Sequence, residues 1–246
     1  LLYTNGHDRA VTWMNSTYNG RPITPRSGYI VEFNALWYNA IKFYQQMLSE
    51  TPGPENEIYA AECEELAQKL QQSFKNVFLN EHGYLLDYVD GQMQDWSVRP
   101  NQIFAIALDF SPLDIKERKR VLDICTRELV TPKGVRSLSP KSGGYNPLYV
   151  GQQTQRDFAY HNGTAWPWLT GFYLEAYLRI YKMSGVNFIE RQLIGFEEEL
   201  FYHCVGTIPE LFDGNPRFSG RGAISFAMNV SGLLRAINIL DKYTRE

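Results

Sequence analysis

The sequence predicts an all-α fold in which apolar inner helices alternate with charged outer helices to form a toroid. Apolar residues recur at helical spacing along most of the 246 residues. Residues 100–110 are apolar on nearly all sides, as an inner helix would be, whereas residues 112–130 are amphipathic and charged. The long loops are rich in polar and aromatic residues, and we expect them to meet at one end. An α-solenoid is the alternative architecture, although it requires short sequence repeats.

The helices can be placed in order from their apolar spacing and their terminal residues. Residues 1–29 are expected to form a loop because glycine and proline interrupt any helical period. Residues 83–96 alternate in polarity and contain Asp90-Gly91, so they predict a hairpin, and little other sheet is expected. Residues 131–158 and 205–221 are expected to be loops. The expected helices are residues 30–48, 55–78, 100–110, 112–130, 164–183, 187–203 and 222–243.

Composition excludes several classes of protein. A net charge of −3 without a long basic run argues against a nucleic-acid-binding surface. No window of about 18 uncharged apolar residues is present, so no membrane span is expected. The odd, widely spaced cysteines Cys63, Cys125 and Cys204 indicate buried thiols of a reducing compartment, and we expect a cytoplasmic protein. No residues have the spacing of zinc or calcium ligands, so we expect neither a metal nor a cofactor.

Residues 157–168, D-F-A-Y-H-N-G-T-A-W-P-W, form the strongest candidate for a functional site. Carboxylates and amides can bind hydroxyl groups, while indole and phenol rings cover the apolar faces of sugars. A polar and aromatic cluster before a helix therefore indicates a sugar site. The alternative is a plain helix entrance, with Asn162 or Thr164 as N-cap and Pro167 in the first turn.

Seven motifs in series resemble one known family. They are T-W-M-N (12–15), T-P-R-S-G (24–28), V-E-F-N-A-L-W-Y-N-A (31–40), R-P-N-Q-I-F-A (99–105), T-P-K-G-V-R-S-L-S-P (131–140), R-D-F-A-Y-H-N-G-T-A-W-P-W (156–168) and E-L-F-D-G (210–214). Together they resemble the C-terminal amylo-α-1,6-glucosidase domain of glycogen debranching enzymes, over essentially the whole chain. The resemblance implies an (α/α)6 toroid and inverting hydrolysis of the single α-1,6-linked glucose at a trimmed branch, with glycogen or a branched α-glucan as substrate.

An (α/α)6 toroid has twelve helices by definition, whereas about seven are expected here. The chain begins with Leu1 rather than an initiator methionine. We therefore expect residues 1–246 to form one partial toroid domain, the C-terminal part of a longer chain. Inner-helix faces that would meet the missing helices should be exposed and apolar, and we expect association with a second copy through them.

Inverting hydrolysis needs a general acid and a general base about 6.5–9.5 Å apart. Glu210, in a loop ahead of the last helix, is similar in place to the family's C-terminal catalytic carboxylate and is the candidate base. The family motif T-W-M-D would supply the acid, but Asn15 stands at that position. An amide has no proton to donate at neutral pH. Either the chain is impaired, or another carboxylate such as Asp8 or Glu32 supplies the proton.

The remaining candidates are polar and aromatic residues of the same loops and helix starts. Arg99 can hold sugar hydroxyls or form a salt bridge with Asp157, and Glu32 and Asn34 can also cap a helix. Trp37 and Trp168 lie within expected helices, and we expect them in the core. The expected substrate-binding residues are Asp8, Trp13, Arg26, Glu32, Arg99, Asn101, Asp157, Tyr160, His161, Trp166 and Asp213.

Two other functions are compatible with these residues. One is a different inverting glucosidase on the same toroid, acting on small oligosaccharides. The other is a non-catalytic carbohydrate-binding relative, which Asn15 favours because a binding protein needs no general acid.

Overall fold

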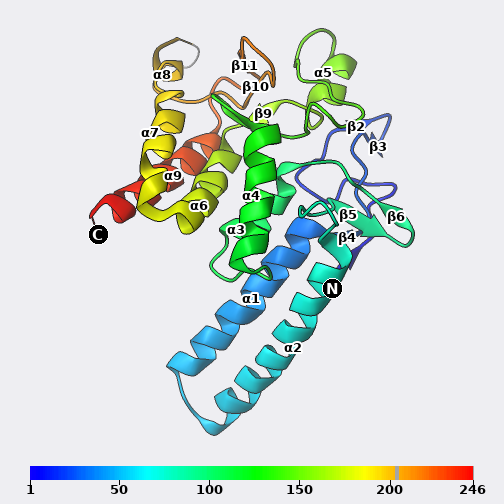
Figure 1. Cartoon of the computed structure of the whole chain (residues 1–246). Helices are drawn as coiled ribbons and strands as arrows, with labels where there is room; N and C mark the ends of the chain where they lie inside the picture. Colours follow the sequence, from blue (N-terminus) through cyan, green and yellow to red (C-terminus); the bar gives the residue numbers. More distant parts are fainter. Residues whose placement is uncertain (203–204, 246) are drawn as a thin grey trace.

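The structure is a computed structural model that describes residues 1–202 and 205–245. Helices make up most of it, and short strands and long loops gather at one end of the helices (Figure 1). The main helices are α1 (Val31–Glu50), α2 (Pro54–Phe78), α3 (Ile103–Ala107), α4 (Ile115–Leu129), α6 (Trp168–Tyr181), α7 (Val186–Ile194) and α9 (Ala227–Arg245). The shorter ones are η1 (Pro100–Gln102), α5 (Gln153–Ala159), η2 (Lys182–Gly185) and α8 (Glu199–Tyr202).

The helices alternate between an inner and an outer layer. Inner helices α1, α3, α6 and α9 follow one another, because α1 packs on α3, α3 on α6 and α6 on α9. Outer helices α2, α4 and α7 pack against this row, and the α1–α2 pair extends away from the rest (Figure 1). The inner helix α6 is buried along most of its length, whereas α4 buries one face only. The alternation predicted from the sequence is thus observed.

The helix boundaries follow from local chemistry. Helix α2 begins at Pro54 and carries Glu55 and Glu57 in its first turn, where the helix dipole favours negative charge. Helix α4 begins with a capping box, in which the Asp114 side chain accepts from the Glu117 N–H and the Glu117 side chain accepts from the Asp114 N–H. The α4 capping box satisfies backbone donors that the helix itself leaves unpaired.

The expectation of little sheet beyond residues 83–96 is wrong. One antiparallel sheet has the order β1 (Tyr3–Thr4), β4 (Gly28–Ile30), β5 (Tyr88–Asp90) and β6 (Met93–Gln94). A second has the order β11 (Gly220–Arg221), β10 (Leu211–Phe212), β9 (Ala165–Trp166), β8 (Gly134–Arg136) and β7 (Val130–Thr131), and β2 (Thr17–Tyr18) pairs with β3 (Arg21–Pro22). Strands of two or three residues are too short to show the alternation that predicts a strand. The hairpin predicted in residues 83–96 is confirmed as β5–β6.

Several helix predictions also need correction. Helix α3 ends at Ala107, α5 lies inside the expected loop 131–158, and the expected helix 187–203 breaks after α7 at Gly195. The last residue of that expected helix, His203, and Cys204 lie outside the described residues. Neither Asn162 nor Thr164 caps α6, because the Trp168 N–H at its start donates to Asn229 Oδ1 on α9 at 3.0 Å.

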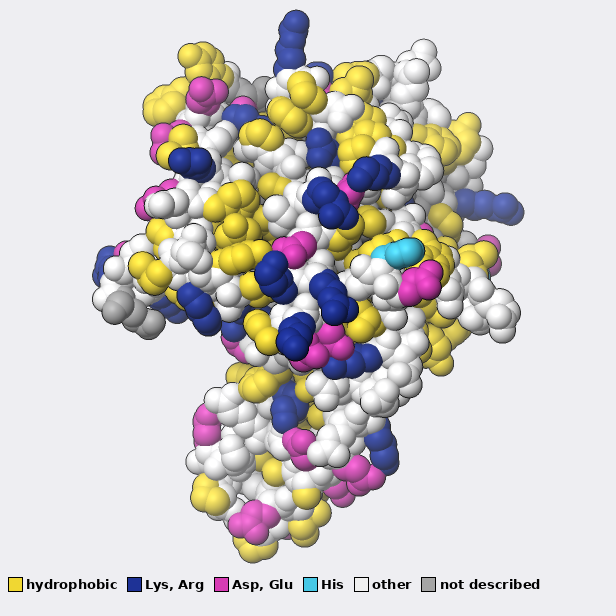
Figure 2. Space-filling view, viewed as in Figure 1, with side chains coloured by type: hydrophobic (Ala, Val, Ile, Leu, Met, Phe, Trp, Pro, Cys, Tyr) yellow, Lys and Arg dark blue, Asp and Glu magenta, His cyan; other side chains and the backbone are white. Residues whose placement is uncertain are grey.

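The exposed apolar surface expected of a partial toroid is present. Figure 2 shows apolar side chains at the surface over the C-terminal helices and along the α1–α2 pair. Trp37 was expected in the core but is 38% exposed, whereas Trp168 is buried as expected. The exposed large apolar residues on the first and last inner helices are Leu36, Trp37, Phe43, Tyr44 and Met47 on α1 and Met228, Leu234 and Ile237 on α9.

Cys63 is half-buried and Cys125 is buried, and both are free thiols. Burial raises the pKa of the Cys125 thiol, which keeps it protonated. Within residues 1–202 and 205–245, no helix has the length and apolar character to cross a membrane.

The contact between inner helices α6 and α9 depends on two glycines. A Cβ at Gly171 would lie 2.4 Å from the Gly232 carbonyl oxygen, and one at Gly232 would lie 2.6 Å from the Trp168 backbone. We predict that Gly171→Ala and Gly232→Ala each lower the free energy of unfolding by about 1–3 kcal/mol, measured by urea denaturation, because the helices must move apart. Gly53→Ala, which adds a Cβ in open space, is the control. Equal stability of all three variants would contradict this packing.

Candidate active site

Trp13 lies at the centre of a cluster of aromatic rings at the start of α6. Its ring makes edge contacts with His161, Trp166 and Trp168, at centroid distances of 5.2, 5.5 and 5.2 Å. The imidazole of His161 stacks on Trp166 at 5.5 Å and 11°. Such ring pairs stabilise a defined geometry beyond the burial of their area. The loop around residue 13 and the stretch 157–168 therefore form one wall, as the sequence analysis expected.

Trp13 is held by a buried amide. Its indole N–H donates to Asn101 Oδ1 at 2.7 Å, and the Asn101 amide nitrogen donates to Asp87 Oδ1 at 2.7 Å. Asn101 is fully buried at the start of the inner helix η1–α3. Asn101 was expected to bind substrate, but both ends of its amide are occupied by these two protein partners. It therefore fixes the indole, and contact with a sugar would come through Trp13.

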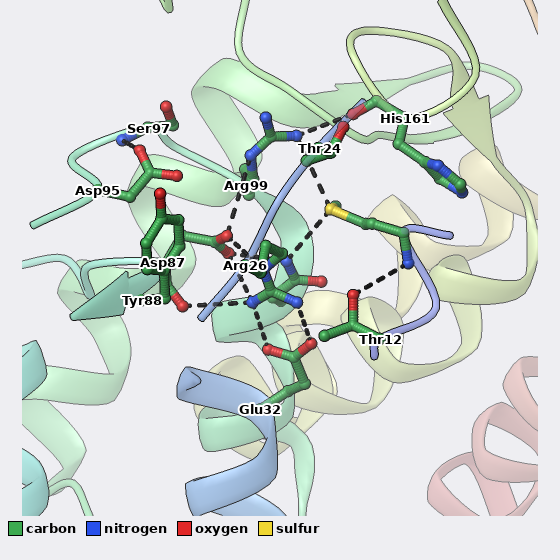
Figure 3. A network of polar contacts seen from close by, with 12 residues as sticks. Thr12, Thr24, Arg26, Glu32, Asp87, Tyr88, Asp95, Ser97, Arg99 and His161 are labelled. Atoms are coloured by element: carbon green, nitrogen blue, oxygen red, sulfur yellow. Dashed lines mark hydrogen bonds and ion pairs between the residues drawn. The ribbon is translucent and has the colours of Figure 1, made fainter. Parts of the chain in front are cut away.

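Arg26, Glu32 and Asp87 form a buried ion cluster beneath this wall (Figure 3). Arg26 Nε donates to Asp87 Oδ2 at 2.7 Å, and Arg26 Nη2 donates to Glu32 Oε2 at 2.6 Å, while Nη1 contacts the other Glu32 oxygen. Burial alone would lower the pKa of Arg26, but the charges of Asp87 and Glu32 raise it above its usual range. Arg26 and Glu32 were expected to bind substrate. The structure instead directs them toward each other, at 2% and 3% exposure.

Arg99 ties the loops of the site together through its guanidinium group. Nη1 donates to the carbonyl oxygens of His161 at 2.8 Å and Ser137 at 3.1 Å. Nη2 donates to Asn162 Oδ1 at 3.2 Å. The salt bridge proposed with Asp157 is not formed, since the acid within range of Arg99 is Asp87, at 3.9 Å. The pairing was mispredicted because Asp87, immediately before β5, lies twelve residues before Arg99 and outside the aromatic stretch.

Glu210 is the half-buried carboxylate of the site, and both of its oxygens are held. The Tyr160 hydroxyl donates to Oε1, and the Ala223 N–H donates to Oε2 at 2.8 Å. Asn229, fully buried on α9, donates to the Glu210 carbonyl oxygen at 2.6 Å. Because Asn229 also accepts from the N–H of Trp168, it fixes Glu210 relative to the aromatic wall. The sequence analysis missed Asn229, because a single asparagine within a helix carries no recognisable signal.

Asn15 is exposed on the loop that carries Trp13. The neighbouring Ser16 hydroxyl donates to the Asp157 carbonyl oxygen at 2.9 Å, so this loop lies against α5. Tyr160 contacts His161 at 4.6 Å and Trp166 at 4.9 Å and also binds Glu210. Continuous contacts therefore connect the Asn15 loop, residues 157–166 and Glu210.

Three further candidates are placed less centrally. Asp157 is half-buried, and its carboxylate accepts from Gln153 Nε2 at 2.6 Å. Asp8 is exposed on the N-terminal loop. Asp213 is buried, accepts from the Tyr149 N–H at 2.8 Å and pairs with Arg221 at 2.8 Å. Asp213 thus joins two loops, and its carboxylate faces protein partners.

His161 is an uncharged ring in this site. Burial, and then the positive charges of Arg99 and Arg26, lower its pKa to about 3. Its Nδ1 is buried and has no hydrogen-bond partner among residues 1–202 and 205–245. His161 is 1% exposed, so it supports Trp13 and Trp166 as a neutral ring and supplies no proton at neutral pH.

The layered helices and the loop-end site define this chain as a partial (α/α)6 toroid. Among solved structures, neutral trehalase Nth1 from Saccharomyces cerevisiae is similar, with a TM-score of 0.64 and 15% identity. The alignment covers 92% of this chain and 42% of the trehalase chain, and at this identity it shows the fold alone.

A sequence model described as amylo-alpha-1,6-glucosidase matches residues 1–235, and the chain belongs to this family. The glycogen debranching enzyme of Saccharomyces cerevisiae (strain ATCC 204508 / S288c) is 28% identical over an alignment 218 residues long, and the alignment covers 72% of this chain and 14% of the yeast protein. The resemblance drawn from the seven motifs is confirmed. The chain is thus a member of a glycosidase family. It spans only a small part of the length of the curated relative that it matches.

The buried ion cluster yields a stability prediction. Asp87→Ala removes a carboxylate that pairs with Arg26 and accepts from Asn101. Removing one partner of a buried pair leaves the other charge uncompensated, which costs about 3–5 kcal/mol. We therefore expect a loss of that size in the free energy of unfolding, measured by urea denaturation. Asp123→Ala, which breaks an exposed pair with Lys119, should change stability very little. Similar losses in the two variants would contradict the role of the cluster.

The lowered pKa of His161 predicts a pH dependence of stability. Unfolding releases an imidazole with a pKa of about 6.5, so the unfolded chain binds a proton that the folded chain excludes between pH 6.5 and about 3. This contribution to stability is complete above pH 6.5 and falls as the pH drops through that window. His161→Gln should therefore reduce the stability difference between pH 7 and pH 5 by about 2 kcal/mol.

The control for this measurement is Tyr173→Phe, which removes a buried hydroxyl that is hydrogen-bonded to Thr126. This variant should lose the same stability at both pH values. An unchanged pH dependence in His161→Gln would show that the imidazole is not held neutral by the fold.

Proposed function

We propose that this chain forms the catalytic cleft of an inverting α-1,6-glucosidase that removes the single glucose left at a trimmed branch of a glycogen-type glucan. The observation that carries the proposal is the fixed carboxylate of Glu210 beside the Trp13 wall. The family match and the similarity to a yeast glycogen debranching enzyme support the substrate class. The wall would cover the apolar face of the glucose while Glu210 acts on its anomeric carbon through water.

Glu210 would serve as the general base. Each carboxylate oxygen has two lone pairs, so Tyr160 and Ala223 leave acceptor capacity for the attacking water. The two donors fix the carboxylate in one orientation, which is what proton abstraction in a defined direction requires. Tyr160 would act through this orientation, since burial and the hydrogen bond to Glu210 raise the pKa of its hydroxyl above its usual range.

Asn15 occupies the position of the general acid, and its amide cannot protonate the leaving oxygen. The two alternative acids are poorly suited to replace it. Glu32 is buried and paired with Arg26, and Asp8 lies in the N-terminal loop outside the contacts that connect residues 13–16 with Glu210. We therefore propose that hydrolysis by this chain is strongly impaired. Asn15 also favours a second function, a non-catalytic carbohydrate-binding protein that uses the same wall and Glu210 to hold a glucan.

The sharpest test of the proposed function is Asn15→Asp. The substitution is nearly isosteric and exposed, so folding should barely change. General acid catalysis contributes about 10²–10⁴-fold, and glucose release from a branched limit dextrin should rise within that range. The double variant Asn15→Asp with Glu210→Gln, which keeps the acid and removes the base, should lose the gain.

The substrate comparison separates the proposed activity from its alternatives. Faster release from maltose or isomaltose than from the limit dextrin would indicate a different glucosidase on the same toroid. Glucan binding without hydrolysis, in both the parent and the Asn15→Asp protein, would support the non-catalytic binding function. Activity that is unaffected by Asn15→Asp but abolished by Asp8→Asn or Glu32→Gln would place the acid elsewhere.

A further inference from the structure

We propose that a groove beside the cleft, between the β2–β3 hairpin and helix α5, binds the glucan chain beyond the glucose at the active site. This inference rests on the proposed function and extends it to the substrate's neighbouring sugar units. The groove has a volume of about 470 Å³ and is open to solvent. In Figure 1 the hairpin and α5 lie next to each other, and the two elements are in contact. Its lining residues are Tyr18, Asn19, Arg21, Pro22, Ile23 and Phe158.

Two exposed aromatic rings form the walls of this groove. Tyr18 is 45% exposed and Phe158 is 43% exposed, and their centroids are 5.7 Å apart with planes inclined at 56°. One ring comes from the hairpin and the other from α5, so their proximity is a product of the fold. Exposed rings beside polar groups are the composition of a sugar-binding surface, because a pyranose has apolar faces and hydroxyl edges.

The hairpin places polar donors next to these rings. Asn19 and Gly20 have φ values of +50° and +76°, the left-handed region that a two-residue hairpin turn requires at both positions. The turn pairs Tyr18 directly with Arg21 across the two strands, and directly paired residues lie on the same face. Tyr18 and Arg21 therefore project from the same face of the hairpin and both line the groove, with Asn19 at the turn. Guanidinium and amide groups donate to hydroxyl oxygens.

The groove lies close to Asn15 of the proposed active site. The Ser16 hydroxyl, which donates to the Asp157 carbonyl oxygen at 2.9 Å, joins the hairpin segment to α5. Asn15 precedes Ser16 and Phe158 follows Asp157 in the sequence, and Tyr18 is three residues beyond Asn15. Three residues span at most about 10 Å. A glucan whose terminal glucose occupied the cleft would thus pass over Tyr18 and Phe158, whereas a disaccharide would have little to contact there.

The test compares glycogen with isomaltose as ligands of Tyr18→Ala, Phe158→Ala and the double variant, by calorimetry. Each ring should contribute about tenfold to glycogen affinity, which corresponds to about 1.4 kcal/mol, and the double variant should lose more than either. Isomaltose affinity should stay within about twofold. Tyr59→Ala, which removes an exposed ring on the distant helix α2, is the matched control and should bind glycogen as the parent does.

The outcomes separate the groove from the proposed function. Unchanged glycogen affinity in the double variant, or parallel losses for glycogen and isomaltose, would overturn the groove and leave the cleft intact as a proposal. Selective loss of glycogen affinity, together with no hydrolysis by the Asn15→Asp protein, would support the groove while rejecting the glucosidase activity. A parent protein that binds no glycogen would reject both. Arg21→Gln, which keeps both rings and removes the guanidinium group, should weaken glycogen binding by a smaller factor in the same selective way.

Discussion

The buried pairing of Arg26 with Glu32 and Asp87 is the constraint on which the arrangement of the site depends. Buried charges must be paired, so the N-terminal loop, the start of α1 and the segment just before strand β5 have to meet at one place. Asp87 also accepts from Asn101, and Asn101 accepts from the indole of Trp13. The position of the Trp13 ring is therefore fixed by a buried ion cluster that does not itself contact the ring.

This dependence explains which parts of the fold could be predicted from the sequence. The long helices α1, α2, α4 and α9 repeat their apolar residues over several turns, so their periods are readable. The two- and three-residue strands and the polar helix α5 are too short to carry a period. The start of α6 was misassigned because its partner, Asn229, comes from a helix about sixty residues later. Such partners exist only after the chain has folded.

In the candidate site, too, some features could be predicted from the sequence and others depend on the fold. The motifs correctly indicated that residues near Trp13, Tyr160 and Glu210 lie together. Arg26, Glu32 and Asp213 have side chains that suit a sugar, but the fold pairs them with protein groups. Sequence reveals the charge of a residue and not its burial. Asp87 was missed for the complementary reason, because a lone carboxylate just before a short strand resembles a surface residue until its partners are seen.

The proposed site consists of the fixed carboxylate of Glu210, the aromatic wall around Trp13, and Asn15 at the proposed position of the acid. We propose that it is the cleft of an inverting glucosidase in which Asn15 limits catalysis. The most direct test is the anomer of glucose first released from a branched limit dextrin by the Asn15→Asp protein, followed by proton NMR. Inversion at an α-linkage by a water activated at Glu210 predicts β-glucose, with α-glucose appearing only through mutarotation. Initial release of α-glucose would contradict the account.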